Sequence, residues 1–134
     1  MTKLLAQAPL RIARPSRDLR MAERFWCDGV GLQVLWRSEP EAEEEHRLMM
    51  LGAADAQWHL ELVDDPDLLS AHPPSPEDLL VLYLGSEADV GWLLRIAESG
   101  GKLVDARNPY WDTWGITILD PDGYRLVLST RSWD

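Results

Sequence analysis

A histidine and a glutamate two positions apart stand in the segment 58–63, and both side chain types could carry chemistry. The alternation of a β-strand puts His59 and Glu61 on one face, while Leu60 and Leu62 lie on the other. Such a pair could act as a general base in catalysis or contribute ligands to a metal ion. The alternative is a hydrogen-bonded histidine without a catalytic role, and both interpretations stay open at this point.

Other residues of reactive type lack the partners that their chemistry needs. Cys27 is the one cysteine, and no His or Lys stands near it to activate the thiol, so we interpret it as a packing residue. His46 and His72 fall in an acidic loop and a proline-rich connection, where solvation is expected. The sequence shows no phosphate-binding loop, since Gly29 and Gly31 end a predicted helix, and it shows no serine nucleophile motif.

Length and charge restrict the class of protein. The 134 residues fit one compact domain, and a net charge of −10 would repel a nucleic-acid backbone and an anionic membrane surface. The sequence contains no run of about 18 apolar residues, which a spanning helix would need. A single cysteine excludes an internal disulfide framework, and the N-terminus has no secretory cleavage pattern. We therefore expect a cytoplasmic protein without nucleic-acid or membrane partners.

The elements that would position the histidine and the glutamate follow a repeated order. Alternation and turn residues predict strands over 10–15, 32–36, 47–51, 58–63, 79–84, 102–106, 116–119 and 124–129. Helical spacing predicts one helix from the N-cap Asp18 to Gly29, and a second from Val90 to the Gly100–Gly101 pair. The acidic loop 39–45 is expected to be a solvated connection.

Two further segments are predicted to lack regular structure. The connection 64–78 contains four prolines, which argue against a helix or a central strand there. The aromatic segment 108–115 is expected to be a loop. An offset of about seventy residues superposes Leu10 on Leu80 and Val34 on Val104, so the order of strand, helix and three strands occurs twice. This duplication argues against a doubly wound parallel sheet.

The repeated unit resembles a known superfamily in three stretches, 17–35, 59–66 and 120–128, which include a helix ending in Gly-x-Gly and the motif DPDGYR. It is similar to the vicinal oxygen chelate superfamily, which groups glyoxalase I, bleomycin-resistance proteins and extradiol dioxygenases. Together with LRIARP and RNPYW, these stretches look like a bacterial subgroup of mostly unassigned function. The resemblance covers nearly the whole chain, from about Leu10 to Thr130.

The resemblance implies an α+β fold in which two tandem βαβββ modules form half-barrels around a cleft. It implies a single domain over 1–134, with module one at about 10–64, a connection at 65–78 and module two at about 79–130. Members of this superfamily that are metal enzymes use four inward side chains from the first and last strands of each module. Carried onto this chain, these positions fall on Arg11, on Glu61, on Leu80 or Val81, and on Val127.

Only Glu61 among these positions could bind a metal ion, because Arg11 stays protonated and the Leu and Val side chains offer no lone pair. One carboxylate would hold a divalent ion weakly. We therefore expect no metal and no other cofactor. Arg11 could instead form a charge-assisted pair with Glu61 at the place of the ion. The alternative is a structural ion pair that merely avoids burying one charge alone, and the two interpretations are compatible.

By the same resemblance, Arg125 shares the cleft face with Arg11, His59 and Glu61, and the aromatic segment edges the cleft. We therefore expect six ligand-binding residues, which combine guanidinium groups for a carboxylate with rings for a flat ligand: Arg11, His59, Glu61, Tyr110, Trp111 and Arg125. An alternative role for Tyr110 and Trp111 is packing in a dimer.

The sequence thus favours a metal-independent protein that binds a small molecule, and the resemblance implies sequestration of a toxic or antibiotic-like compound. The resemblance implies a homodimer with clefts between its subunits. The alternative is a lyase, isomerase or dioxygenase-type enzyme that uses His59 or Glu61 as catalytic residue together with Arg11. A regulatory or interaction module with an empty cleft is a third interpretation. The ligand's identity and the dimer's arrangement do not follow from the sequence.

Overall fold

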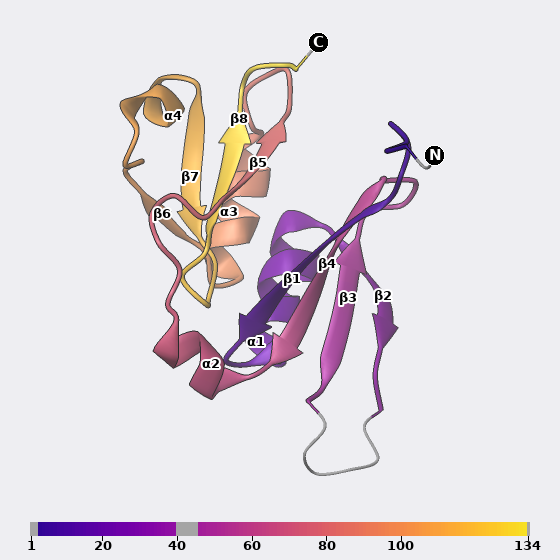
Figure 1. The fold of residues 1–134 in the computed structure, drawn as a ribbon. Helices are drawn as coiled ribbons and strands as arrows, with labels where there is room; N and C mark the ends of the chain where they lie inside the picture. The colour runs from indigo at the N-terminus through magenta and orange to yellow at the C-terminus, as the bar shows by residue number, and fades with distance from the viewer. Residues whose placement is uncertain (1–2, 40–45, 134) are drawn as a thin grey trace.

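The computed structural model describes residues 3–39 and 46–133, and the chain forms two modules of the expected order (Figure 1). The acidic segment 40–45 lies outside the described residues. The first module consists of β1 (Leu10–Ser16), α1 (Leu19–Glu23), η1 (Arg24–Val30), β2 (Gln33–Arg37), β3 (Leu48–Gly52) and β4 (Trp58–Asp64). The second module consists of β5 (Leu79–Tyr83), α3 (Val90–Glu98), β6 (Lys102–Val104), β7 (Gly115–Leu119) and β8 (Arg125–Ser129).

Each module contains a four-stranded mixed sheet, and the two sheets have the same topology. The strand order is β1-β4-β3-β2 in the first sheet and β5-β8-β7-β6 in the second. The first strand of each module runs parallel to the last one, and the remaining pairs are antiparallel. The α+β fold of two tandem βαβββ modules is therefore confirmed.

One face of each sheet packs against the helix of its own module. Leu60 of β4 and Leu126 of β8 are buried on these faces, and Phe25, Trp26 and Ile96 are buried on the helices. All five belong to one hydrophobic cluster that continues across both modules. Since burial of one large apolar side chain contributes about 2 kcal/mol, this shared cluster stabilises the two modules as one unit.

The first helix begins where the sequence predicted and widens before its end. The Asp18 side chain accepts hydrogen bonds from the N–H groups of Arg20 and Met21, at 2.9 and 3.2 Å. From Arg24 onwards the helix continues as the π-helix η1 and ends at Gly31, whose φ of +104° suits glycine. The sequence analysis located both ends of the helix but gave no indication of its wider second half.

The two modules meet through η1 and α3, which lie in the middle of the molecule (Figure 1). Trp92 Nε1 donates to the carbonyl of Val30 at 2.9 Å, and Arg95 Nε donates to the carbonyl of Gly29 at 3.2 Å. A Cβ atom at Gly29 would stand 3.1 Å from Ile96 Cα, a contact tighter than real Cβ atoms usually make. The glycine therefore permits the close approach of the two helices.

Two short helices correct the sequence analysis. The connection 64–78 contains α2 (Pro66–Ala71), and the aromatic segment contains α4 (Pro109–Thr113), so the predictions of no helix in these places are wrong. In both cases the proline occupies the first helical turn, where its missing N–H costs nothing. Asp65 and Asn108 cap the two helices with their side-chain oxygens. No helix in 3–39 or 46–133 has the length and apolar composition that crossing a bilayer requires.

A buried arginine forms a second junction between the modules. Arg14 of β1 is 8% exposed, and its guanidinium carbon lies 4.4 Å from the centre of the Tyr124 ring. Its Nη1 atom has no hydrogen-bond partner among the described residues. Nearby, the buried Asp120 accepts hydrogen bonds from the N–H groups of Asp122 and Tyr124, both at 2.9 Å. Burial and the neighbouring Asp122 raise the pKa of Asp120 to about 6, although Arg14 opposes this shift.

This shifted carboxyl predicts how stability depends on pH. Between the ordinary pKa of 3.8 and about 6, the folded chain holds a proton on Asp120 that the unfolded chain releases. The contribution of Asp120 to the free energy of unfolding therefore falls as the pH rises through this window. Asp120→Asn keeps an acceptor oxygen without the charge, so its stability relative to the wild type should rise by up to about 3 kcal/mol from about pH 4 to about pH 8.

Denaturant unfolding at both pH values measures this difference. Asp67→Asn, an exposed position in α2, is the matched control and should show no comparable change. The prediction is wrong if the wild type gains stability relative to Asp120→Asn as the pH rises.

Candidate functional site

Three of the six expected site residues lie side by side on the face of the first sheet that points away from the helices. In the parallel pair of β1 and β4, Arg11 stands opposite His59, and Ala13 stands opposite Glu61. The alternate residues of β4, Leu60 and Leu62, are buried in the core. The alternation that the sequence analysis assigned to this strand is therefore correct, and it leaves the polar face open.

Arg11 forms a hydrogen bond with one of the other polar side chains and an ion pair with the other. Its Nε donates to His59 Nε2 at 3.0 Å, and its Nη1 lies 3.7 Å from Glu61 Oε1. The Arg11 side chain is 51% exposed and that of Glu61 is 17% exposed. The ion pair expected from the resemblance is thus present, in a partly solvated setting where such a pair contributes little to stability.

The bond from Arg11 also determines where His59 carries its proton. A guanidinium stays protonated in proteins, so its Nε–H can only donate. His59 Nε2 must therefore accept with its lone pair, and the proton of the neutral imidazole lies on Nδ1. The Nε2 lone pair is consequently not available to take a proton from a substrate or to bind a metal ion.

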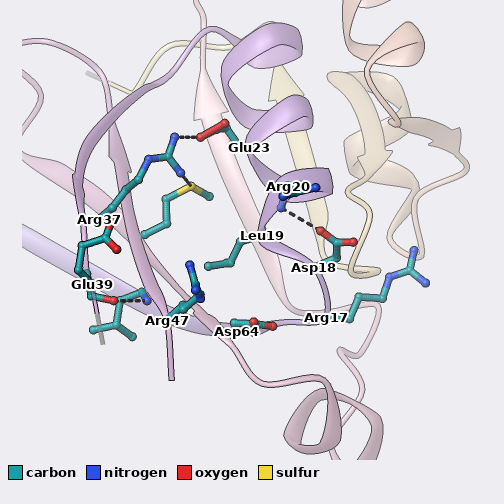
Figure 2. A pocket seen from close by; sticks show the side chains of 12 residues that line it. Arg17, Asp18, Leu19, Arg20, Glu23, Arg37, Glu39, Arg47 and Asp64 are labelled. Atoms are coloured by element: carbon teal, nitrogen blue, oxygen red, sulfur yellow. Dashed lines mark hydrogen bonds and ion pairs between the residues drawn. The ribbon is translucent and has the colours of Figure 1, made fainter. Parts of the chain in front are cut away.

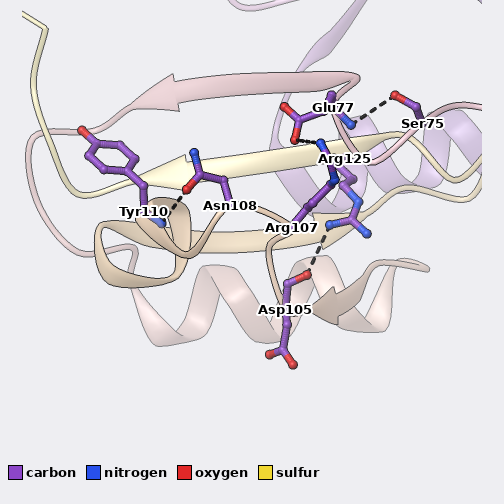
Figure 3. Close-up of polar contacts among 7 residues, drawn as sticks. All are labelled: Ser75, Glu77, Asp105, Arg107, Asn108, Tyr110 and Arg125. Carbon is purple, nitrogen blue, oxygen red and sulfur yellow. Dashed lines mark hydrogen bonds and ion pairs between the residues drawn. The ribbon is translucent and has the colours of Figure 1, made fainter.

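The other expected residues belong to the second module (Figure 3). Arg125 at the start of β8 donates from Nη1 to the carbonyl of Asp105 at 3.2 Å. Arg107, two residues after Asp105, forms an ion pair with Glu77 at 2.8 Å. These contacts fasten the segment that leads from β6 to α4. Arg125 is therefore already engaged in holding the chain, which its type and position in the sequence did not indicate.

Tyr110 and Trp111 form an aromatic cluster on α4. The two rings meet edge to face with centres 4.9 Å apart, and the Trp111 ring lies 6.4 Å from that of Tyr83. Tyr83 in turn lies 5.7 Å from Trp133 near the C-terminus. Tyr110 and Tyr83 remain substantially exposed. The cluster offers ring surfaces at the end of β5 and on α4.

The face of the second sheet that points away from α3 is more covered than the equivalent face of the first sheet. Val127 of β8 pairs with Thr117 of β7 and with Val81 of β5. Val127 and Thr117 are 0% and 1% exposed, and α4 packs against β7. The hydroxyl of Thr117 has no hydrogen-bond partner within the described part of the chain. The two modules therefore present different surfaces on corresponding faces.

No contact found within the described residues joins the two groups of expected site residues. No hydrogen bond or ion pair between them is present, and none of the described hollows is lined by members of both groups. A common ligand cleft for all six residues stays a prediction.

The described residues also form a hollow of about 600 Å³ that the sequence analysis did not anticipate (Figure 2). It lies between α1 and the ends of the first module's strands. Across it, Arg37 bonds to Glu23, and Arg37 Nη1 lies 3.5 Å from Met49 Sδ. Its charged residues come from distant segments without a shared spacing, so no sequence motif predicts the hollow. The charged residues that line it are Arg17, Asp18, Arg20, Glu23, Arg37, Glu39, Arg47 and Asp64.

The four positions that the resemblance assigns to a metal ion do not fit one. Glu61 faces a guanidinium, and Val127 has no donor atom. Val81 lies on the same face as Val127, whereas Leu80 belongs to the core. Within 3–39 and 46–133, no group of three His, Cys, Asp or Glu side chains is placed to share an ion. The side chains at this place therefore do not form the ligand set that a divalent ion requires.

The remaining histidines and the cysteine lie outside these groups. His46 is exposed, with Nδ1 2.8 Å from the carbonyl of Asp64 and Nε2 3.6 Å from Asp65 Oδ2. His72 is exposed at the end of α2. Burial raises the pKa of the Cys27 thiol, and neighbouring carboxylates add to this shift. The thiol is therefore not activated as a nucleophile.

Comparison with known proteins supplies the family. Residues 10–63 match the YycE-like N-terminal domain, and residues 77–130 match the YycE-like C-terminal domain. The chain is 33% identical over 122 residues to the uncharacterized protein YycE of Bacillus subtilis. The aligned stretch covers 90% of this chain and 86% of that protein.

Solved structures agree with this assignment. The crystal structure of the B. subtilis YycE protein superposes with a TM-score of 0.77 at 29% identity, over 96% of this chain and 93% of that one. TnmS3, an antibiotic binding protein from Streptomyces sp. CB03234, superposes with a TM-score of 0.64 at 23% identity, over 98% of this chain and 100% of that one. The fosfomycin resistance protein FosX of Mesorhizobium loti superposes with a TM-score of 0.70 at 16% identity, over 98% of this chain and 94% of that one. The chain therefore belongs to the YycE-like family, within the vicinal oxygen chelate superfamily.

Proposed function

We propose that this protein binds a small molecule without a metal ion and sequesters it. The observation that carries the proposal is the Arg11 guanidinium, which lies against His59 and Glu61 at the place that the resemblance assigns to the ion. A fixed cation at this place repels a second cation and offers N–H donors to a ligand.

The state of His59 favours binding over catalysis. A general base needs a free lone pair within reach of the substrate proton. The Nε2 lone pair of His59 is occupied by Arg11, at 3.0 Å. A lyase, isomerase or dioxygenase-type reaction that uses His59 or Glu61 remains the alternative, and it would require this contact to open during turnover.

The names of similar proteins support a ligand of the antibiotic type. TnmS3 is described as an antibiotic binding protein, and FosX is described as a fosfomycin resistance protein. Both share only the fold with this chain at these levels of identity. We infer that the present protein likewise takes up a toxic or antibiotic-like compound in the cytoplasm.

We further infer that a second copy of the chain completes the ligand cleft. The polar group Arg11, His59 and Glu61 lies on the first module, while Arg125 and the aromatic cluster lie on the second. The open face of the first sheet also exposes Leu35 and Trp36, each by 51%. Pairing of the first module of one chain with the second module of another would bring the two groups together and cover this apolar surface.

Metal content tests the proposal most directly. Protein purified without a chelator or a histidine tag should contain less than about a tenth of an equivalent of any transition metal, because too few ligands converge on one point. Elemental analysis against protein concentration measures this ratio. A full equivalent of zinc, nickel, manganese or iron would contradict the proposal and make His59 and Glu61 the leading ligands.

Recovery of a bound compound separates binding from catalysis. Tryptophan fluorescence in a screen of small aromatic compounds should identify a ligand, and mass spectrometry after prolonged incubation should recover it unchanged. Glu61→Gln should retain affinity within about tenfold, because a neutral amide still accepts a hydrogen bond from Arg11. Chemical conversion by the wild type that disappears in Glu61→Gln would establish the enzymatic alternative instead.

Sedimentation tests the second copy. The wild type should sediment at twice the mass of one chain, and Trp36→Glu should shift it towards the monomer, because a charge would replace an apolar ring in the interface. Leu68→Glu, at an exposed leucine of α2, is the matched control and should leave the dimer intact. A wild type that sediments only as a single chain at all concentrations would contradict the inference.

A further inference from the structure

We propose that Arg11, held in place by His59 and Glu61, binds the oxyanion of an amphipathic small molecule, such as a carboxylate or a phosphonate with an apolar body. The inference rests on the proposed function and names the class of ligand for the same site. It depends on three features of the open face of the first sheet: the fixed guanidinium, the tautomer of His59 and the apolar residues beside them.

The guanidinium of Arg11 is held at two of its edges. Nε donates to His59 Nε2 at 3.0 Å, and Nη1 lies 3.7 Å from Glu61 Oε1. A guanidinium has five N–H groups, so several of them remain without a protein partner. Since half of the side chain is exposed, these groups face solvent and can reach a ligand. A side chain held in this way loses little conformational freedom when it binds an anion.

His59 orients the guanidinium and leaves no free acceptor beside it. Because Nε2 accepts from Arg11, the ring carries its proton on Nδ1. Nδ1 has no hydrogen-bond partner among the described residues, and the ring is partly exposed. Nδ1 lies on the other side of the ring from Nε2, so its N–H points away from Arg11, and the N–H groups free for an anion at this place are those of the guanidinium. The one carboxylate is already turned towards Arg11. Such an excess of donors suits a group that only accepts hydrogen bonds, which is the property of an oxyanion.

The floor beside the donors is apolar. Ala13 and Met50 stand opposite Glu61 on the neighbouring strands. Gly52 stands opposite His59, and a Cβ there would lie 2.9 Å from Leu35 Cδ1, so the leucine lies over the glycine. Trp36 pairs with Met50 on the same face and is half exposed. A ligand held at Arg11 can therefore lay an apolar body on these residues.

Because the whole chain is negatively charged, binding of an anion depends on the N–H donors of Arg11. At a net charge of −10, the long-range field repels an anion. Binding of an oxyanion must then come from short-range hydrogen bonds at one place. Removal of that place should abolish the selectivity for anions, whereas loss of an arginine elsewhere should have little effect.

The tautomer of His59 is the first test, and it needs no ligand. In histidine labelled with ¹⁵N, long-range ¹H–¹⁵N spectra distinguish an Nδ1–H ring from an Nε2–H ring. The wild type should show His59 as Nδ1–H, and Arg11→Lys should lose this preference because it lacks the Nε–H donor. Arg20→Lys, an exposed arginine on α1, should retain it. An Nε2–H ring in the wild type would overturn the proposal.

Binding of simple probes is the second test. Benzoate and phenylphosphonate carry an oxyanion on a flat apolar body, while benzamide and benzylamine have the same body without the anion. By calorimetry, both anions should bind the wild type at least about tenfold more tightly than benzamide, and Arg11→Gln should abolish this difference. Arg20→Gln is the matched control and should preserve it.

Each result of the binding test decides the proposal. Benzamide or benzylamine binding as tightly as the anions would overturn the assignment to oxyanions, while the proposed function as a binder would stand. Failure of both anions to bind at about 10 mM would also overturn the ligand class. The measurements of metal content and of recovery of an unchanged ligand test the proposed function independently of these probes.

Discussion

The close contact between η1 and α3 is the constraint on which the rest of this structure depends. Gly29 allows the helices to approach until Arg95 and Trp92 reach carbonyl groups of η1. This approach merges two small hydrophobic interiors into one cluster. A unit of one helix and four strands would bury little apolar surface alone, so the helix contact supplies what each module lacks. It also commits the alternate residues Leu60, Leu62, Leu126 and Leu128 to packing, so the polar side chains between them lie on the outer faces of the sheets.

On the outer face of the first sheet, a single arginine changes the chemistry of its neighbours. Arg11 takes the Nε2 lone pair of His59 and directs its charge towards Glu61. These are the two side chains that would otherwise be suited to a metal ion or to proton transfer. An ion and the guanidinium cannot occupy this place together, because both are cations and both need the same lone pairs. In the first module, one residue therefore both engages the two possible metal ligands and supplies hydrogen-bond donors.

The sequence was sufficient for features that depend on local patterns. The alternation in 58–63 and the cap at Asp18 gave a strand and a helix start in the right places. The helix α2 was missed because the prolines of 64–78 were weighed as helix breakers, although Pro66 occupies the first turn. The helix α4 was missed because the segment 108–115 was interpreted as an aromatic loop, although Pro109 can begin a helix in the same way. The engagement of Arg125 with Asp105 depends on how the chain returns over β8, and residue type alone carries no information on that path.

The duplication itself explains why the two halves of the expected site differ. Two copies of one unit begin with equivalent outer faces, but in the second module α4 packs on β7, while Arg107 and Arg125 fasten the preceding segment. Val127 is buried at the position that corresponds to Glu61, which remains partly exposed in the first module. A polar group at Val127 would lie away from solvent, at a cost that an apolar side chain avoids. Under the proposed function, ligand recognition through charge would belong to the first module, and the second module would contribute the ring surfaces of Tyr83 and Tyr110.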